Sequence, residues 1–251
     1  SIPTLSKYNY IYTPEEVINF INTENMEENF ISIIDNIMGT FNDAYAFYDV
    51  SVNPPQPRDN ANYHKKVDIY QRLIELKGKI NNRAITEVYD FYREIIGIFS
   101  ELKDSHIIIN WKSFNFQDFF IIAPIEFYIQ EIEGNYKIFA TCLSEEFEDE
   151  SDVGISNALT LCEENLESPI LSINEKDPFE FIKTFGGNFL STKNEHATFS
   201  FKLKNHNQLS LNDFPLSLEE LSNLKIQFES NAEILTQYYI GSDIEIDIPE
   251  G

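Results

Sequence analysis

The chain has 251 residues, of which 42% are hydrophobic, and it includes 21 Phe and 13 Tyr. This apolar content can bury one large core or two modest ones, which excludes an intrinsically disordered chain. The formal net charge of -24 at pH 7 opposes binding to a phosphate backbone or an anionic membrane, so we expect no nucleic-acid partner. The sequence contains no run of about 18 apolar residues, and we therefore expect no membrane span.

Helical periodicity dominates the first part of the chain. Thr13-Pro14-Glu15-Glu16 predicts a helix N-terminus, with Thr13 as the N-cap, Pro14 at the first helical position and Glu16 completing a capping box. From there to about Tyr48, apolar residues recur at steps of three and four, which is typical of a packing surface rather than a cofactor site.

A proline-rich segment, Val52-Asn-Pro-Pro-Gln-Pro57, then predicts a stiff extended linker, because each proline fixes its own φ and restricts the residue before it. Helical periodicity resumes at about Val67, is predicted to break near Gly78, and runs again from Ile85 to Leu102. The first 110 residues are therefore predicted to form a helical domain.

The apolar pattern then changes to one that favours strands. Short β-branched and aromatic runs cover residues 107–109, 119–122, 125–129 and 136–141, and Glu133-Gly134-Asn135 predicts a hairpin turn between the last two. Residues 145–152 carry six carboxylates in eight positions. We interpret this run as a solvated loop; the alternative, a calcium site, does not match the spacing of an EF-hand loop.

The last third of the chain is predicted to be mixed. Ile170–Ile173 followed by Asn174-Glu-Lys-Asp-Pro predicts a strand, a tight turn and a helix of about two turns, and Phe185-Gly-Gly-Asn188 predicts a helix C-cap rather than a phosphate loop. The remaining predictions are strands at 197–201, 226–228 and 235–240, a short helix at 218–224, and an alternating edge strand at 243–248.

One segment, Glu101-Leu-Lys-Asp104-Ser-His106, contains candidate catalytic residues. It places an acidic side chain and an imidazole between a predicted helix and a predicted strand. His106 there could serve as a general base at the mouth of a cleft. The alternative is that Asp104 caps or turns the chain and His106 is an ordinary half-buried strand residue.

The other histidines are predicted to be structural: His64 exposed, His196 at a turn or strand edge, and His206 in a loop. The chain has no Gly-x-Ser-x-Gly elbow and no His or Cys metal signature, and we expect neither a cofactor nor a metal.

The sequence does not decide the cellular compartment of the protein. Cys142 and Cys162 could form one disulfide in an oxidising compartment or remain two free thiols in the cytosol. The amino terminus carries no secretory leader, so the protein is secreted or vesicular if a signal peptide was removed and cytoplasmic otherwise.

Several of these motifs together resemble the amino-terminal half of the carboxy-terminal-processing (tail-specific) family of serine peptidases. The proline linker and Leu102-Lys-Asp104-Ser-His106 are similar to the branch with tricorn-core and chlamydial protease-like activity factor members. Residues 125–141 and 168–182 resemble its PDZ-like insert, whose I-N-G-x-D-P segment corresponds to Ile173-Asn-Glu-Lys-Asp-Pro, with Glu175 where glycine is usual. Residues 185–198 resemble the segment that follows in protozoan and fungal relatives.

The resemblance implies an α+β fold in three parts. These are a helical bundle over residues 1–110, a PDZ-like insert over 120–184, and a β-containing segment over 185–251 that leads toward a crotonase-like catalytic domain absent from this chain. It also implies that His106 is the general base, that Asp104 is a structural or orienting member of the motif, and that the nucleophilic serine lies on a carboxyl-terminal part. The chain would then be inert alone, and its partners would be that catalytic half and a peptide or protein substrate.

Two alternatives remain. A degenerate relative that kept only its docking module would be a non-catalytic peptide- or protein-binding module, in which the edge of a sheet accepts an extended peptide. A helical-plus-β interaction subunit unrelated to peptidases is the other. Within these residues only His106 distinguishes an enzyme from a binding module, because a binding module has no chemical need for it.

Overall fold

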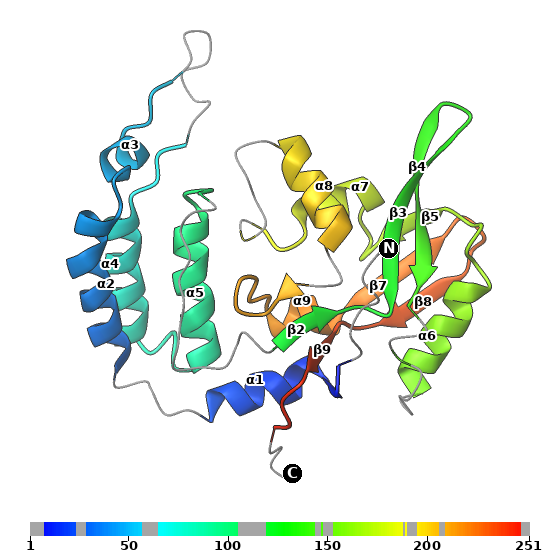
Figure 1. Cartoon of the computed structure of the whole chain (residues 1–251), viewed down its shortest axis with the longest axis horizontal. Coiled ribbons are helices and arrows are strands. Elements are labelled where there is room, and N and C mark those ends of the chain that lie inside the picture. Colours follow the sequence, from blue (N-terminus) through cyan, green and yellow to red (C-terminus); the bar gives the residue numbers. More distant parts are fainter. Residues whose placement is uncertain are drawn as a thin grey trace. The chain divides into compact units, whose positions relative to one another are not determined.

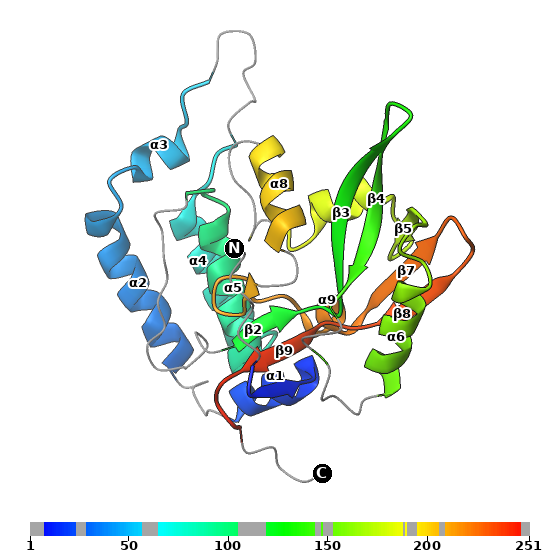
Figure 2. The same ribbon diagram turned by 45° about the vertical axis from the view of Figure 1, so that its right-hand side comes forward.

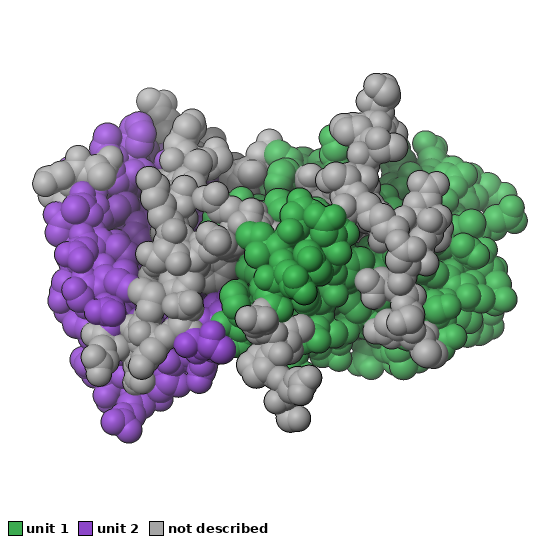
Figure 3. Space-filling view, turned by 60° about the horizontal axis from the view of Figure 1, so that its bottom comes forward, with its two compact units in different colours: residues 1–20, 110–251 green, residues 21–109 purple. Residues whose placement is uncertain are grey.

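The computed structural model describes residues 8–23, 29–56, 65–104, 119–143, 147, 153–187, 189, 195–205 and 209–246. Helices and small antiparallel sheets alternate within them, consistent with the predicted α+β class (Figure 1). The chain divides into two compact units, one of Ser1–Phe20 with Asn110–Gly251 and one of Ile21–Ile109 (Figure 3). The domain boundaries inferred from the resemblance stay predictions.

The unit of Ile21–Ile109 is helical. It contains α2 (Phe30–Ala44), α3 (Tyr48–Val52), α4 (Ile69–Asn81) and α5 (Val88–Ser100). Most of α5 is buried; its buried residues are Val88, Tyr89, Phe91, Tyr92, Ile95, Ile96, Ile98 and Phe99. The ring of Phe30 on α2 stacks on that of Phe91 at a centroid distance of 4.1 Å. Apolar residues at helical spacing thus form the core of this unit, as the periodicity predicts.

The helix break predicted near Gly78 lies a few residues later along the chain, between α4 and α5. The helix α4 continues through Gly78 to Asn81, and the Asn82 N–H donates to the Gly78 carbonyl at 3.1 Å. A single glycine within a helix costs only about 1 kcal/mol, which the burial of Leu73 and Leu76 offsets. The chain turns instead at Arg83, whose φ is 55°.

The predicted capping box is confirmed at α1 (Pro14–Asn22). The Thr13 N–H donates to Glu16 Oε2 at 2.7 Å, and the Glu16 N–H donates to Thr13 Oγ1 at 3.3 Å. Two amide groups that the helix leaves without partners are satisfied in this way.

The described residues of the other unit form three antiparallel sheets. The first has the order β1–β9–β2–β6, the second is the β3–β4 hairpin, and the third has the order β5–β7–β8 (Figures 1 and 2). The strands are β1 (Tyr10–Tyr12), β2 (Phe119–Ile122), β3 (Ile125–Ile132), β4 (Asn135–Cys142), β5 (Ile170–Ile173), β6 (Leu209–Ser210), β7 (Leu224–Phe228), β8 (Glu233–Thr236) and β9 (Tyr239–Ser242). The helices of this part are α1, α6 (Val153–Glu163), α7 (Pro178–Thr184), α8 (Glu195–Asn205) and α9 (Leu218–Ser222).

The predicted hairpin is confirmed. Strands β3 and β4 pair without a break from Ile125↔Cys142 to Ile132↔Asn135. The turn residues Glu133 and Gly134 have φ values of 52° and 81°, as a two-residue hairpin loop requires. Figure 2 shows this hairpin extending from the end of β2.

The predicted strand at 197–201 is wrong, because this segment lies inside α8. Its alternating aromatic and β-branched residues favour a strand, but the buried residues Thr198 and Lys202 are four positions apart, which is the spacing of one helix face. The ring of Phe199 also stacks on Phe179 of α7, at 6.1 Å. Packing against a neighbouring helix therefore overrides the local preference.

The predicted edge strand at 243–248 is wrong over its described residues, 243–246. Side chains rather than a neighbouring strand accept the backbone N–H groups there: Ile244 donates to Ser242 Oγ at 3.0 Å, and Ile246 donates to the Tyr12 hydroxyl at 3.0 Å. The strand lies one segment earlier, where β9 pairs with both β1 and β2. The single strand predicted over 235–240 is in fact the end of β8 and the start of β9. The strand predicted over 107–109 lies outside the described residues.

The strand, turn and helix predicted from residue 170 onward are confirmed as β5, a turn and α7. The Asp177 side chain caps α7 by accepting from the N–H of Phe179 at 3.0 Å. The turn residues Asn174 and Glu175 have φ values of 47° and 63°. Glu175 thus occupies a left-handed position that favours glycine, which gives a physical reason for the glycine usual in the segment it resembles.

We expect Glu175→Gly to raise the free energy of unfolding by about 0.5–1 kcal/mol, since relief of left-handed strain exceeds the added chain entropy of glycine. The ion pair between Glu175 and Lys225, at 3.9 Å with Glu175 82% exposed, contributes little. Urea denaturation measures the change. Glu180→Gly, inside α7, is the matched control and should lower stability; a loss of stability in both variants would contradict the expectation.

Candidate functional site

The structure describes the candidate catalytic segment only as far as Asp104, and His106 lies outside the described residues. The role of His106 is therefore untested by the geometry. The described residues up to Asp104 show how the chain leaves α5.

The chain leaves α5 through a tight turn. The N–H of Leu102 donates to the Phe99 carbonyl at 3.1 Å, and that of Lys103 donates to the Ser100 carbonyl at 3.0 Å. Lys103 then takes a φ of 51°, which redirects the backbone immediately before Asp104. Leu102 is buried, so the turn is attached to the core of the helical unit.

An ion pair ties the start of this turn to α4. Arg72 donates from Nε and Nη2 to Glu101 Oε1, at 3.0 and 2.7 Å, and from Nη1 to Glu75 Oε2 at 3.0 Å. The hydrogen bond with Glu101 is the main cause that raises the pKa of Arg72. Both side chains are partly exposed to solvent, so the ion pair contributes little to the free energy of unfolding and mainly orients the start of the turn.

A second contact ties Asp104 to the end of α2. The Tyr45 hydroxyl donates to Asp104 Oδ2 at 3.3 Å, across 59 residues of sequence. The Tyr45 ring stacks on Phe41 at 5.1 Å, and Phe41 contacts Phe99 of α5 at 5.2 Å. Burial raises the pKa of Tyr45, and the charge of Asp104 and its hydrogen bond raise that pKa further. No sequence signal marks Tyr45, because its partner is distant in the chain.

The structure describes one of the other three histidines, His196. His196 is exposed in the first turn of α8, rather than before a strand as predicted. His64 and His206 lie outside the described residues, as does most of the acidic run at 145–152. In the part of the chain that the structure describes, no group of three His, Cys, Asp or Glu side chains could hold a metal ion. No described helix has both the length and the apolar character needed to span a membrane.

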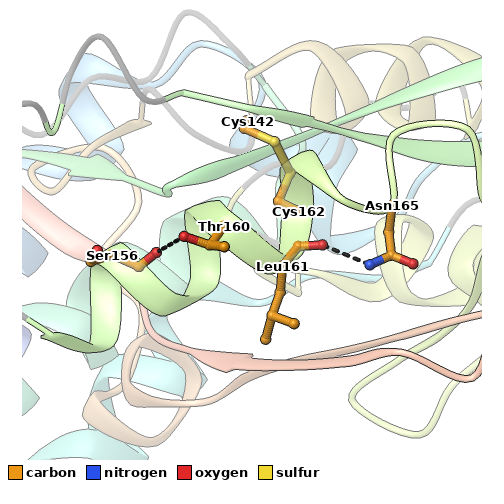
Figure 4. The surroundings of a disulfide bond; sticks show 6 residues. All are labelled: Cys142, Ser156, Thr160, Leu161, Cys162 and Asn165. Atoms are coloured by element: carbon orange, nitrogen blue, oxygen red, sulfur yellow. Dashed lines mark hydrogen bonds between the residues drawn. A yellow bond between two sulfur atoms is a disulfide. The ribbon is translucent and has the colours of Figure 1, made fainter.

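The structure contains a disulfide between Cys142 at the end of β4 and Cys162 on α6, with a Cα–Cα distance of 5.9 Å (Figure 4). This resolves the two alternatives for the cysteines. The Asn165 side chain donates to the Leu161 carbonyl at 2.8 Å and so satisfies the end of the same helix. Because disulfides form and persist in oxidising compartments, the bond favours the secreted or vesicular alternative over the cytoplasmic one.

Comparison with known proteins gives one informative match. No protein-family model matches the chain, and no curated protein matches it either. A crystal structure of mature CPAF, the chlamydial protease-like activity factor, matches 90% of this chain with a TM-score of 0.52 at 12% sequence identity. The chain has a CPAF-like fold. It spans 38% of the length of the CPAF chain.

Tyr238 is a fully buried tyrosine that lies outside the candidate catalytic segment. Its ring stacks on Phe185 at 5.5 Å, and its hydroxyl has no hydrogen-bond partner among the described residues. Burial raises the pKa of Tyr238, and repulsion from Glu220 adds to this. Burial likewise raises the pKa of Tyr12, Tyr45 and Tyr48.

These shifts predict a loss of stability above about pH 10, because the unfolded chain releases tyrosine protons there that the folded chain still holds. We expect Tyr238→Phe to reduce this alkaline loss. At neutral pH the variant should be at least as stable as the wild type, since a buried hydroxyl without a partner is removed. Urea denaturation at pH 8 and pH 10.5 measures both effects. Tyr136→Phe, at a residue that is 64% exposed, is the control and should behave as the wild type; an equal alkaline loss in Tyr238→Phe would contradict the prediction.

Proposed function

We propose that the chain is the amino-terminal portion of a serine endopeptidase-like protein of the carboxy-terminal-processing family. The observation that carries the proposal is the CPAF-like fold over 90% of the chain, in a sequence with Leu102-Lys-Asp104-Ser-His106 directly after the buried helix α5. His106 is then the general base, and the serine nucleophile belongs to a carboxyl-terminal part outside this sequence. That part and a peptide or protein substrate are the partners, and the reaction needs no cofactor.

In this mechanism the imidazole of His106 takes the proton of the serine hydroxyl as the seryl oxygen attacks the scissile carbonyl. It then returns the proton to the leaving amine as the acyl-enzyme forms. A base of this kind works only if its position is reproducible. The tight turn after α5 supports the proposal here, because it gives the segment before His106 a defined direction.

The segment at 120–184 supplies a PDZ-like docking or regulatory module in the same proposal. Two observations support this part of the proposal. Residues 125–141, which resemble the first part of the family's insert, form the β3–β4 hairpin. Residues 168–182, which resemble its later part, form β5, a turn with left-handed residues and the start of α7. An extended substrate would add as a strand to a sheet edge, where main-chain hydrogen bonds give affinity and side-chain pockets give preference. The alternative function, a non-catalytic binding module, uses this same surface without the chemistry.

The test uses the complete gene product that contains this chain, treated with a fluorophosphonate probe for active-site serines. We expect the wild type to take the label and His106→Ala to lose it by about 100-fold or more. His196→Ala, at an exposed histidine of α8, is the matched control and should label as the wild type does. A wild type that does not label, or a His106→Ala variant that labels normally, would overturn the proposal; absence of labelling with retained peptide binding would favour the binding module.

A further inference from the structure

We propose that the outer edge of β3, near the turn of the β3–β4 hairpin, binds an extended peptide segment that carries basic side chains. The inference names the edge and the class of peptide for the docking module of the proposed function, on which it rests. Three features of the hairpin carry it: the direction of its main-chain groups, its exposure and its charge.

The pairing within the hairpin decides which residues of β3 bond to β4. At the turn, a two-residue loop makes Ile132 and Asn135 a hydrogen-bonded pair. At the other end, the N–H of Leu143 donates to the carbonyl of Pro124 at 2.9 Å. Hydrogen-bonded and non-hydrogen-bonded pairs alternate along an antiparallel ladder. Both ends therefore assign the bonds with β4 to the even-numbered residues of β3.

The odd-numbered residues Ile129 and Glu131 consequently direct their N–H and C=O groups to the outer side of β3. Within the described residues, β4 is the only strand that pairs with β3. Tyr128, Gln130 and Glu131 are exposed, and the turn end of the hairpin projects beyond β5 and α7 (Figures 1 and 2). Outward main-chain groups on an exposed strand accept an added strand.

The charge of this edge selects the partner. Strand β3 contains two glutamates and no basic residue, and Glu133 in the turn adds a third carboxylate. Glu131 and Glu133 are exposed and form no ion pair within the described residues. The lysine of the hairpin, Lys137, already donates to Glu229 at 2.8 Å. A partner with basic side chains is therefore favoured, whereas the formal charge of -24 disfavours a second copy of this chain.

The register of an added antiparallel strand defines the peptide further. Its main chain would bond to Ile129 and Glu131, and directly opposite side chains would lie on the same face of the sheet. A lysine or arginine opposite Glu131 reaches the free carboxylate. Two positions later in the peptide, an apolar side chain lies opposite the half-buried Ile129. The preferred pattern is therefore a basic residue, any residue, then an apolar residue.

The first test uses this chain and two blocked peptides, one with Lys-Thr-Ile in a run of Thr and Ser and one with Glu-Thr-Ile in the same run. Binding is followed by NMR of the backbone amides. We expect the Lys peptide to shift the amide signals of Ile129 and Glu131 and to bind at least about 10-fold more tightly than the Glu peptide. Equal affinities, no binding, or signal shifts confined to other residues would overturn the proposal.

Matched variants separate the edge from the general negative charge. Glu131→Lys should weaken binding of the Lys peptide about 10-fold, whereas Glu164→Lys, at an exposed residue after α6, makes the same change in net charge and should have no effect. Glu131→Pro removes an outward N–H that the hairpin does not use, so it should keep the fold and lose both peptides. Unchanged binding in Glu131→Lys, or equal weakening in Glu164→Lys, would contradict the assignment.

The outcomes also separate this inference from the proposed function. If the complete gene product takes the serine probe and loses it in His106→Ala, but Glu131→Lys binds the Lys peptide as the wild type does, the edge assignment fails and the peptidase stands. If the Lys peptide binds at β3 and no serine takes the probe, the peptidase fails and the edge belongs to a binding module.

Discussion

Loss of the Cys142–Cys162 disulfide is expected to lower the free energy of unfolding by about 3 kcal/mol. The bond joins residues separated by 20 positions, and a cross-link over a loop of that length removes this much conformational freedom from the unfolded chain. Cys162 is fully buried on α6. The bond therefore also holds the end of this helix beside the end of β4. For a chain of this size the expected fall in Tm is about 6–12 °C.

The measurement compares the wild type with a Cys142→Ser, Cys162→Ala double variant, each with and without reductant. Reductant should lower the Tm of the wild type toward that of the variant and should leave the variant unchanged. This arrangement separates the cross-link from the small cavity that alanine leaves at position 162. A wild type whose Tm does not respond to reductant would show that the bond adds no stability.

Truncation of Lys202 is expected to cost about 3 kcal/mol of folding free energy. Its side chain is 1% exposed, and its Nζ donates to the carbonyls of Lys183 at 2.9 Å and Gly187 at 3.2 Å. The Lys183 carbonyl lies in the last turn of α7, where a helix leaves acceptors without partners and favours a positive charge, and the Gly187 carbonyl lies in the turn that follows. Lys202→Ala removes the buried methylenes and also the donor of two part-buried hydrogen bonds.

Two further variants show which part of the lysine matters. Lys202→Met keeps most of the apolar volume and should cost about half as much as Lys202→Ala, the remainder being the lost hydrogen bonds. Lys204→Ala, at an exposed position two residues along α8, should not change the urea midpoint measurably. If Lys202→Ala denatured at the same urea concentration as Lys204→Ala, the structural role of the buried amine would be wrong.

Sequence reasoning succeeds here where neighbouring residues decide the structure. The Thr13–Glu16 capping box and the Glu133-Gly134 turn are each formed by residues within four positions of one another. Their physical signals are side chains that accept local N–H groups and residues that tolerate a positive φ.

Sequence reasoning fails where contacts between residues far apart in the sequence decide the structure. The strand prediction at 197–201 could not include the contact of Phe199 with Phe179, which lies on another helix. The end of the chain was misplaced for the same reason, because the Tyr12 hydroxyl accepts the N–H of Ile246 across 234 positions. The candidate site follows this rule as well: Asp104 is visible as part of a motif, whereas Tyr45 is visible only in the fold.

The proposal that this chain belongs to a serine peptidase with its nucleophile on another part of the protein is tested most directly by one measurement. The protein is isolated from its natural source, its native mass is determined, and the preparation is treated with an active-site serine probe. The account predicts that the sequence is found in, or together with, a longer or second polypeptide that takes the label. A single species at about 29.2 kDa that takes no label would contradict it and would leave the binding module as the better account.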